Sequence, residues 1–190
     1  MMRDLESTLR PVGRPRKMER GSGKSSLSPF SPSLFPLNFW EVSLISLRDN
    51  FDLESSHVIP ALIKKCVDAI NNNEDEIVAW GTGKASREFL YVEDAAEAII
   101  LATERYDKSD PINIGAGFEI TIKDLVELIV KLTGFKGKIV WDASKPDGQL
   151  RRMLDTSKAE REFGFKAKTS FEEGLRKTIE WYRESKEVNE

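Results

Sequence analysis

From Asn50 onward, short apolar runs typical of strands alternate with longer amphipathic stretches typical of helices. Strands are predicted over residues 76–80, 87–92, 111–117 and 138–142, and helices over 60–70, 95–106, 122–133, 156–163 and 171–182. Strands that alternate with helices favour an α/β fold in which at least part of the strand pairing is parallel.

Short polar side chains and glycines mark the expected helix ends. Thr121 is placed to cap one helix, and Gly134 to end it. Ser170, followed three residues later by Glu173, predicts a capping box for the last helix. Asp94 is expected to cap the helix over 95–106, and Pro60 to open the first one.

The first 48 residues differ in composition from the rest. Residues 1–48 hold eight Lys/Arg and four Asp/Glu, whereas residues 49–190 hold 21 Lys/Arg and 28 Asp/Glu. Repeated Arg, Ser, Gly and Pro in the first 33 residues leave too little apolar surface to offset the entropy of ordering. We therefore expect a disordered basic tail over 1–48, with a short strand within 34–48 that has no evident partner, and a folded region over 49–190.

Composition excludes several classes of site and partner. With one cysteine, Cys66, and one histidine, His57, the chain can form neither an internal disulfide nor a Cys/His zinc site. No apolar run approaches the roughly 20 residues of a membrane span, so no membrane partner is expected. The acidic folded region is a poor non-specific binder of nucleic acid.

The basic tail leaves two other interpretations open. Residues 12–17, "VGRPRK", resemble the core of an AT-hook, which inserts arginines into the narrow minor groove of A·T-rich DNA. The same stretch is compatible with an organellar transit peptide, although Asp4, Glu6 and Glu19 count against it. "GSGKSS" at 21–26 fails as a phosphate loop, because Met18 stands where the pattern needs glycine.

Trp80 and Arg87 flank a Gly-Thr-Gly turn between two predicted strands. An indole can stack on a ring and a guanidinium matches a diphosphate, but core packing and a surface ion pair explain the same residues. His57 can transfer a proton or only hydrogen-bond within its loop. From the pattern alone, Asp147 is a turn residue and Cys66 a core thiol.

Four segments carry a family resemblance: "DNFDLESSHVIPALIKK", "VAWGTGKASREFLYVEDAAEAI", "INIGAG" and "VWDASKPDGQLRRMLD". Together they resemble the GDP-L-fucose synthases, which are NADP-dependent epimerase/reductases of the extended short-chain dehydrogenase superfamily. The similarity extends from about residue 49 to about residue 183. "SHVIPAL" and "ASKPDG" are specific to this family, whereas "REFLYVED" is shared with other nucleotide-sugar enzymes.

The resemblance implies an activity and a set of site residues. The family epimerises C3 and C5 of GDP-4-dehydro-6-deoxy-D-mannose and reduces C4 with NADPH, which yields GDP-L-fucose. His57 matches a proton-transfer residue that also lies near the cofactor, and the residues matching GDP-sugar contacts are Lys65, Trp80, Arg87 and Asp147. The resemblance further implies a homodimer and a cytoplasmic location.

The sequence also departs from the family. It contains no G-x-x-G-x-x-G, it lacks the family's first half with the Tyr-x-x-x-Lys pair that belongs there, and "SLISLR" replaces the loop before "DNF". We therefore expect the C-terminal substrate-binding lobe without most of the Rossmann half, an incomplete NADP(H) site and no activity of this chain alone. The alternatives are a DNA-binding or scaffold protein that uses the basic tail, and a truncated product without function.

Overall fold

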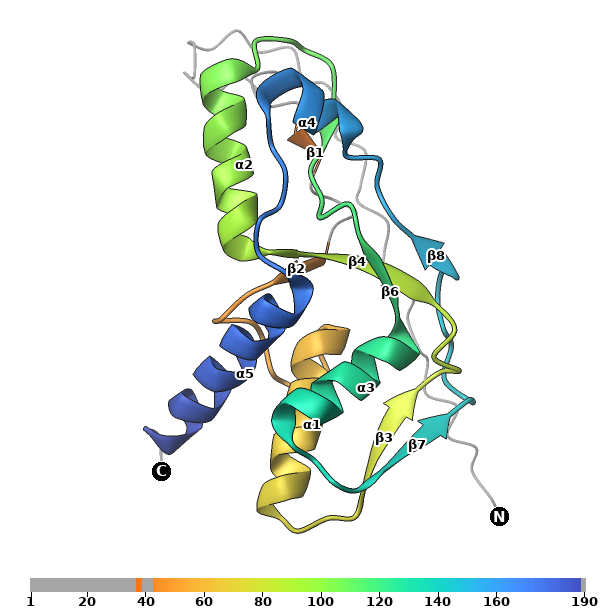
Figure 1. Ribbon diagram of the computed structural model, residues 1–190. Coiled ribbons are helices and arrows are strands. Elements are labelled where there is room, and N and C mark those ends of the chain that lie inside the picture. Colours follow the sequence, from red (N-terminus) through yellow and green to blue (C-terminus); the bar gives the residue numbers. More distant parts are fainter. Residues whose placement is uncertain (1–36, 39–42, 189–190) are drawn as a thin grey trace, which may run out of the picture. The chain divides into compact units, whose positions relative to one another are not determined.

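The strands of the computed structural model, which describes residues 37–38 and 43–188, pair mainly in parallel (Figure 1). The parallel pairs are β1 (Leu37–Asn38) with β5 (Ile112–Asn113), β2 (Ser43–Ile45) with β4 (Ser86–Tyr91), β3 (Glu76–Trp80) with β7 (Lys138–Asp142), and β4 with β8 (Arg151–Arg152). β6 (Glu119–Thr121) pairs antiparallel with β4. The α/β class and the partly parallel pairing predicted from the sequence are confirmed.

The helices pack on the strands around two hydrophobic clusters. They are α1 (Val58–Asn71), α2 (Val92–Arg105), α3 (Ile122–Thr133), α4 (Ser157–Phe163) and α5 (Phe171–Glu187). One cluster joins α1, α3 and α5 to β3 and β4, with Ile63, Leu125 and Leu175 fully buried. The other joins α2 and α4 to β5 through Ala98 and Phe163. In Figure 1, β4 connects the α2–α4 group with the α1–α3 group.

Residues 43–45 belong to the sheet. β2 runs parallel to β4 with Leu44 opposite Leu90, and Ile45 is buried in the core. The strand expected within 34–48 therefore exists and has a partner that the sequence did not indicate. The first 36 residues, with the predicted disorder, the AT-hook-like segment and the transit-peptide alternative, lie outside the described residues, and the domain boundary after residue 48 stays a prediction.

Local capping signals are confirmed at three helices. Thr121 Oγ1 accepts a hydrogen bond of 3.0 Å from Asp124 N at the start of α3, which ends at Gly134 with φ 75°. Ser170 Oγ accepts from Glu173 N at 3.2 Å at the start of α5. Gly164 ends α4 with φ 77°, directly after the helix predicted over 156–163. Left-handed backbone at these positions favours glycine, because it has no Cβ.

Two predicted helix starts are wrong. α1 begins at Val58, two residues before Pro60, because the first N–H groups of a helix need no partner within it and proline is tolerated there. α2 begins at Val92, and Asp94 lies buried in its first turn instead of capping it. The Asp94 carboxylate accepts hydrogen bonds from the backbone N–H groups of Lys168 and Thr169, which come from a distant segment of the chain.

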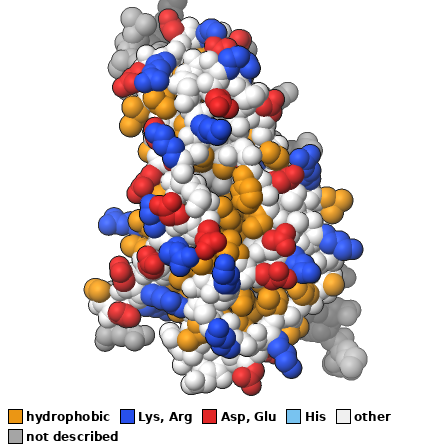
Figure 2. Space-filling model, viewed as in Figure 1, with side chains coloured by type: hydrophobic (Ala, Val, Ile, Leu, Met, Phe, Trp, Pro, Cys, Tyr) orange, Lys and Arg blue, Asp and Glu red, His pale blue; other side chains and the backbone are white. Residues whose placement is uncertain are grey.

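The surface in Figure 2 carries charged side chains of both signs with hydrophobic side chains exposed between them. The negative charge of residues 49–190 is thus not gathered into one acidic patch on this face. None of the helices in residues 43–188 combines the length and the apolar character that crossing a bilayer requires.

Candidate functional site

The Gly-Thr-Gly turn between β3 and β4 allows a carboxylate to lie directly against the backbone. Gly81 and Gly83 have φ 85° and 75°, and Gly81 N donates to Asp142 O at 2.9 Å. A Cβ added at Gly81 would lie 2.3 Å from Asp147 Oδ1. The glycine is therefore required for both its backbone conformation and the close approach of Asp147.

Asp147 joins the turn to Arg87. Its Oδ1 accepts from Thr82 N and its Oδ2 from Thr82 Oγ1, both at 2.6 Å, and these hydrogen bonds lower the pKa of the carboxyl. The Arg87 guanidinium donates to the carbonyl oxygens of Asp147 at 3.2 Å and of Ser86 at 2.7 Å. Two of its five N–H donors are thus used by the protein, and the other three can serve a ligand.

Trp80 is exposed and lies beside two lysines. Its side chain, at the end of β3, is 58% exposed, and Lys65 Nζ and Lys145 Nζ each lie 5.2 Å from the ring centroid. Lys65 also donates to Val78 O at 2.8 Å, and burial lowers the pKa of its ammonium group. Because Trp80 is exposed, core packing does not account for it. Within the described residues Arg87 forms no ion pair, so a surface ion pair does not account for Arg87.

Short polar side chains shape the loop that leads to His57. Asp52 Oδ1 accepts from the backbone N–H groups of Glu54 and Ser55, and Asn50 Nδ2 donates to Ser55 Oγ. Such local bonds fold the loop tightly. His57 then occupies the N-cap position of α1, is exposed, and makes no capping hydrogen bond with its side chain.

A cavity of about 220 Å³ connects the surroundings of His57 with Trp80. Lys65 and Trp80 line it together with apolar residues of α1 and α3, and so do Ser56 and Val58 on either side of His57. Ser56 Oγ is buried without a hydrogen-bond partner among the described residues. The structure thus groups Trp80 with Lys65, and groups Arg87 with Asp147, which is bound to the turn at Thr82. His57 lies beside the cavity without a described contact to these residues.

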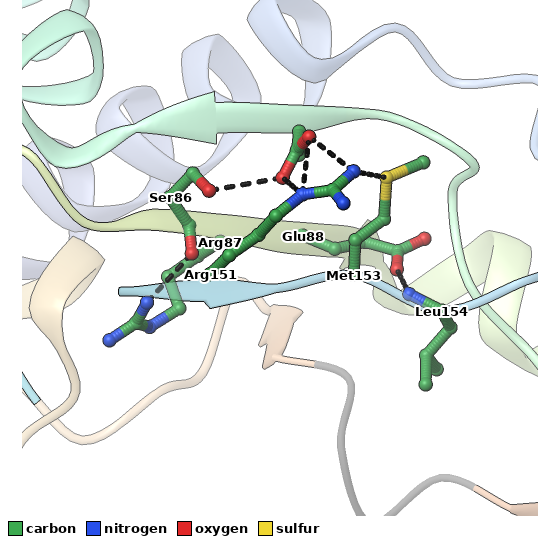
Figure 3. A network of polar contacts seen from close by, with 7 residues as sticks. Ser86, Arg87, Glu88, Arg151, Met153 and Leu154 are labelled. Atoms are coloured by element: carbon green, nitrogen blue, oxygen red, sulfur yellow. Dashed lines mark hydrogen bonds and ion pairs between the residues drawn. The ribbon is translucent and has the colours of Figure 1, made fainter. Parts of the chain in front are cut away.

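A second polar network fixes the strand that carries Arg87 (Figure 3). Glu119 on β6 accepts a bidentate pair of bonds from Arg151 on β8, from Nε to Oε2 at 3.0 Å and from Nη2 to Oε1 at 2.8 Å, and a bond of 3.0 Å from Ser86 Oγ. Glu88, which is 3% exposed, accepts from Gly117 N at 2.8 Å and Leu154 N at 2.7 Å. These carboxylates hold β4, β6 and β8 together around Arg87.

Sequence reasoning missed Thr82, Lys145 and Glu88. Thr82 lies between the two glycines of the quoted turn, and Lys145 precedes "PDG", so proximity to predicted site residues was an available signal for both. Glu88 carries no such signal, because only the tertiary structure shows that it is buried.

Residues 37–115 match the NAD dependent epimerase/dehydratase family. The chain is 47% identical over 143 residues to the probable GDP-L-fucose synthase 1 of Oryza sativa subsp. japonica, covering 75% of this chain and 43% of that protein. It is 35% identical over 199 residues to the GDP-L-fucose synthase of Escherichia coli (strain K12), covering 96% and 60%.

A solved GDP-L-fucose synthetase from Naegleria fowleri, bound to NADP, superposes with a TM-score of 0.71 at 32% identity. The match covers 77% of this chain and 46% of that one. The chain thus spans roughly half the length of the relatives that it matches, and corresponds to their C-terminal part. The chain thus resembles the GDP-L-fucose synthases, an NADP-dependent enzyme family, over most of its length.

The described residues do not fit the dinucleotide by themselves. A dinucleotide grip places a glycine-rich loop between a strand and a helix N-terminus. Here the Gly81–Gly83 turn leads into a strand, and β4 and β6 continue directly into α2 and α3. Within residues 43–188, no group of three or more His, Cys, Asp or Glu is placed to hold a metal ion.

Proposed function

We propose that this chain is the substrate-binding lobe of a GDP-L-fucose synthase-like enzyme, in which Lys65, Trp80, Arg87 and Asp147 bind the GDP-sugar. The observation that carries the proposal is the grouping of an exposed indole, unpaired cations and an anchored arginine around one glycine turn. An indole offers a ring for stacking, and a guanidinium can bind phosphate oxygens in a bidentate manner. The relatives' names point to the same class of ligand.

Asp147 acts mainly by ordering the site. Both of its carboxylate oxygens accept from Thr82, and its carbonyl oxygen holds the Arg87 guanidinium. Each carboxylate oxygen can still accept a further bond, for example from a sugar hydroxyl. We infer that Asp147 fixes the turn and Arg87 in the geometry that a diphosphate requires, and contacts the substrate from the same position.

His57 is proposed as one proton-transfer group of the epimerisation. Inversion at a carbon next to a carbonyl requires one group to remove a proton and another to return it to the opposite face. The proposal is supported by the exposure of His57 and by its neighbours Ser56 and Val58, which line the cavity of Lys65 and Trp80. We assign no reduction step to this chain, since its described residues lack a dinucleotide grip.

Binding of GDP tests the site. Titration calorimetry should detect GDP binding to the 190-residue chain, and Arg87→Ala should weaken it at least about tenfold, since one charge-assisted bidentate contact contributes on the order of 1.5–3 kcal/mol. Arg176→Ala is the control, because Arg176 lies on the surface of α5 and pairs with Glu172. Equal GDP affinities of the wild type and Arg87→Ala would contradict the proposed site.

An activity assay tests the assignment of chemistry. With GDP-4-dehydro-6-deoxy-D-mannose and NADPH, the purified chain should show no steady NADPH oxidation, and steady turnover would refute the proposed incompleteness. Exchange of deuterium from D₂O into C3 and C5, followed by NMR, reports proton transfer without reduction. Any exchange by the wild type should fall in His57→Asn.

The homodimer and the cytoplasmic location implied by the resemblance also stay predictions. Light scattering coupled to size-exclusion chromatography measures the first, with a mass near twice the 21.6 kDa of the chain as the expected result. A mass near that of one chain would contradict it.

A further inference from the structure

Lys145, which neither the sequence pattern nor the resemblance singled out, extends the cationic surface around Trp80. Its Nζ and that of Lys65 each lie 5.2 Å from the centroid of the indole. The two ammonium groups are therefore at most twice that distance apart. A diphosphate can bridge such a gap with one hydrogen bond of about 2.8 Å at each end.

The backbone around Lys145 is anchored on both sides. Lys145 N donates to Asp142 O at 3.2 Å, and Ser144 N donates to Asp142 Oδ1 at 3.0 Å. Two residues further on, the Asp147 carboxylate is held by Thr82. Because β7 pairs with β3, and β8 after the loop pairs with β4, the loop is also fixed at its two ends. The ammonium group thus extends from a defined position next to Trp80.

The cations around Trp80 form no direct ion pairs in the described part of the chain. In the described part of the chain, ion pairs engage many lysines, such as Lys64 with Asp68 and Lys177 with Glu173, but none engages Lys65, Lys145 or Arg87. The carboxylates nearby, Asp142 and Asp147, accept hydrogen bonds from the neutral donors Ser144 and Thr82, and Lys145 acts on Asp142 through its charge without a direct ion pair. The ammonium groups of Lys65 and Lys145, both beside the Trp80 ring, repel each other, and an anion bound between them offsets that repulsion.

We propose that Lys145 is a further substrate-binding residue, which binds a phosphate of the nucleotide-sugar diphosphate together with Lys65 beside the Trp80 indole. This inference rests on the proposed function, and it assigns the diphosphate to a particular edge of the site. Lysine suits this role as a compact point charge with three rotatable donors, whereas Arg87 supplies the fixed fork. The loop between β7 and β8 thereby contributes a cation as well as Asp147.

Calorimetry with GDP and with guanosine tests the proposal on the full 190-residue chain. Lys145→Ala should weaken GDP binding roughly three- to tenfold, as expected for one exposed phosphate contact, and leave guanosine binding unchanged. Lys145→Arg should restore most of the GDP affinity, because it keeps the charge. Lys136→Ala is the matched control, since Lys136 is an exposed lysine outside the site.

Each other outcome decides against the proposal. If the wild type and Lys145→Ala bind GDP equally while Arg87→Ala is weakened, Lys145 is not a phosphate contact, although the proposed function stands. If Lys145→Ala weakens GDP and guanosine alike, Lys145 only supports the indole. If the wild type binds neither ligand, the proposed function and this inference fail together.

Discussion

Substitution of Gly81 by alanine should disturb the candidate site more than it disturbs the fold. Gly81 has φ 85°, and an added Cβ would lie 2.3 Å from Asp147 Oδ1 and 3.3 Å from its Cγ. The atoms it meets belong to a side chain that can rotate away. Asp147 should therefore leave Thr82, and the carbonyl that holds Arg87 should lose its position.

The chain offers a matched control at Gly134. Its φ is 75°, close to that of Gly81, but a Cβ there would meet nothing within 4 Å. Left-handed backbone costs alanine about 1–2 kcal/mol, which lowers the Tm of a domain of this size by roughly 2–8 °C. Gly134→Ala should show this loss alone, whereas Gly81→Ala should show it together with the displacement of Asp147.

The two variants are compared by thermal unfolding and by GDP calorimetry. Both should lower the Tm by the stated amount, and only Gly81→Ala should also lower the GDP affinity, by about tenfold, which is the effect expected for losing Arg87. If both variants bind GDP as well as the wild type does, the contact between Gly81 and Asp147 has no part in ligand binding. The reasoning from the turn to the site is then refuted.

Two further predictions concern buried groups. Glu88→Ala leaves Gly117 N and Leu154 N without their acceptor, at a cost of about 1–3 kcal/mol for each unsatisfied group. Urea unfolding should therefore show a large loss in the free energy of unfolding. A loss below about 1 kcal/mol would contradict the burial of Glu88. Burial raises the pKa of the Cys66 thiol to about 11 from 9.0, so the folded state holds this proton more tightly than the unfolded chain does. The free energy of unfolding should therefore fall as the pH rises from about 9 to about 11. That part of the decline should be absent in Cys66→Ala, and equally steep curves for the two proteins would count against a raised pKa.

Features that depend on a few neighbouring residues followed from the sequence. Thr121, Gly134 and Ser170 mark helix ends because their side chain or backbone acts on N–H and C=O groups within the same turn. The alternation of apolar periodicities was enough to predict an α/β fold. The resemblance supplied the candidate residues Lys65, Trp80, Arg87 and Asp147, and the structure pairs Lys65 with Trp80 and Arg87 with Asp147 at the two ends of the glycine turn.

Features that depend on distant segments did not follow. Asp94 satisfies every local rule for an N-cap, yet it accepts from the backbone at Lys168 and Thr169, because the chain between α4 and α5 packs against the first turn of α2. Likewise, nothing near Glu88 in the sequence indicates that the segments at Gly117 and Leu154 will supply its donors.

The sequence by itself therefore determined the five helices, where most of them end, and the strands β3, β4 and β7, whereas it indicated neither β6 nor β8 and gave β5 too long. The resemblance named the candidate side chains for a nucleotide-sugar site. Only the tertiary structure decided that Lys145 joins Lys65 at Trp80, and that Asp147 orders both the turn and Arg87. The physical reason is that capping and periodicity act within a few residues. The pairing of β7 with β3 and of β8 with β4, by contrast, results from the burial of many apolar side chains at once, and no single residue encodes it.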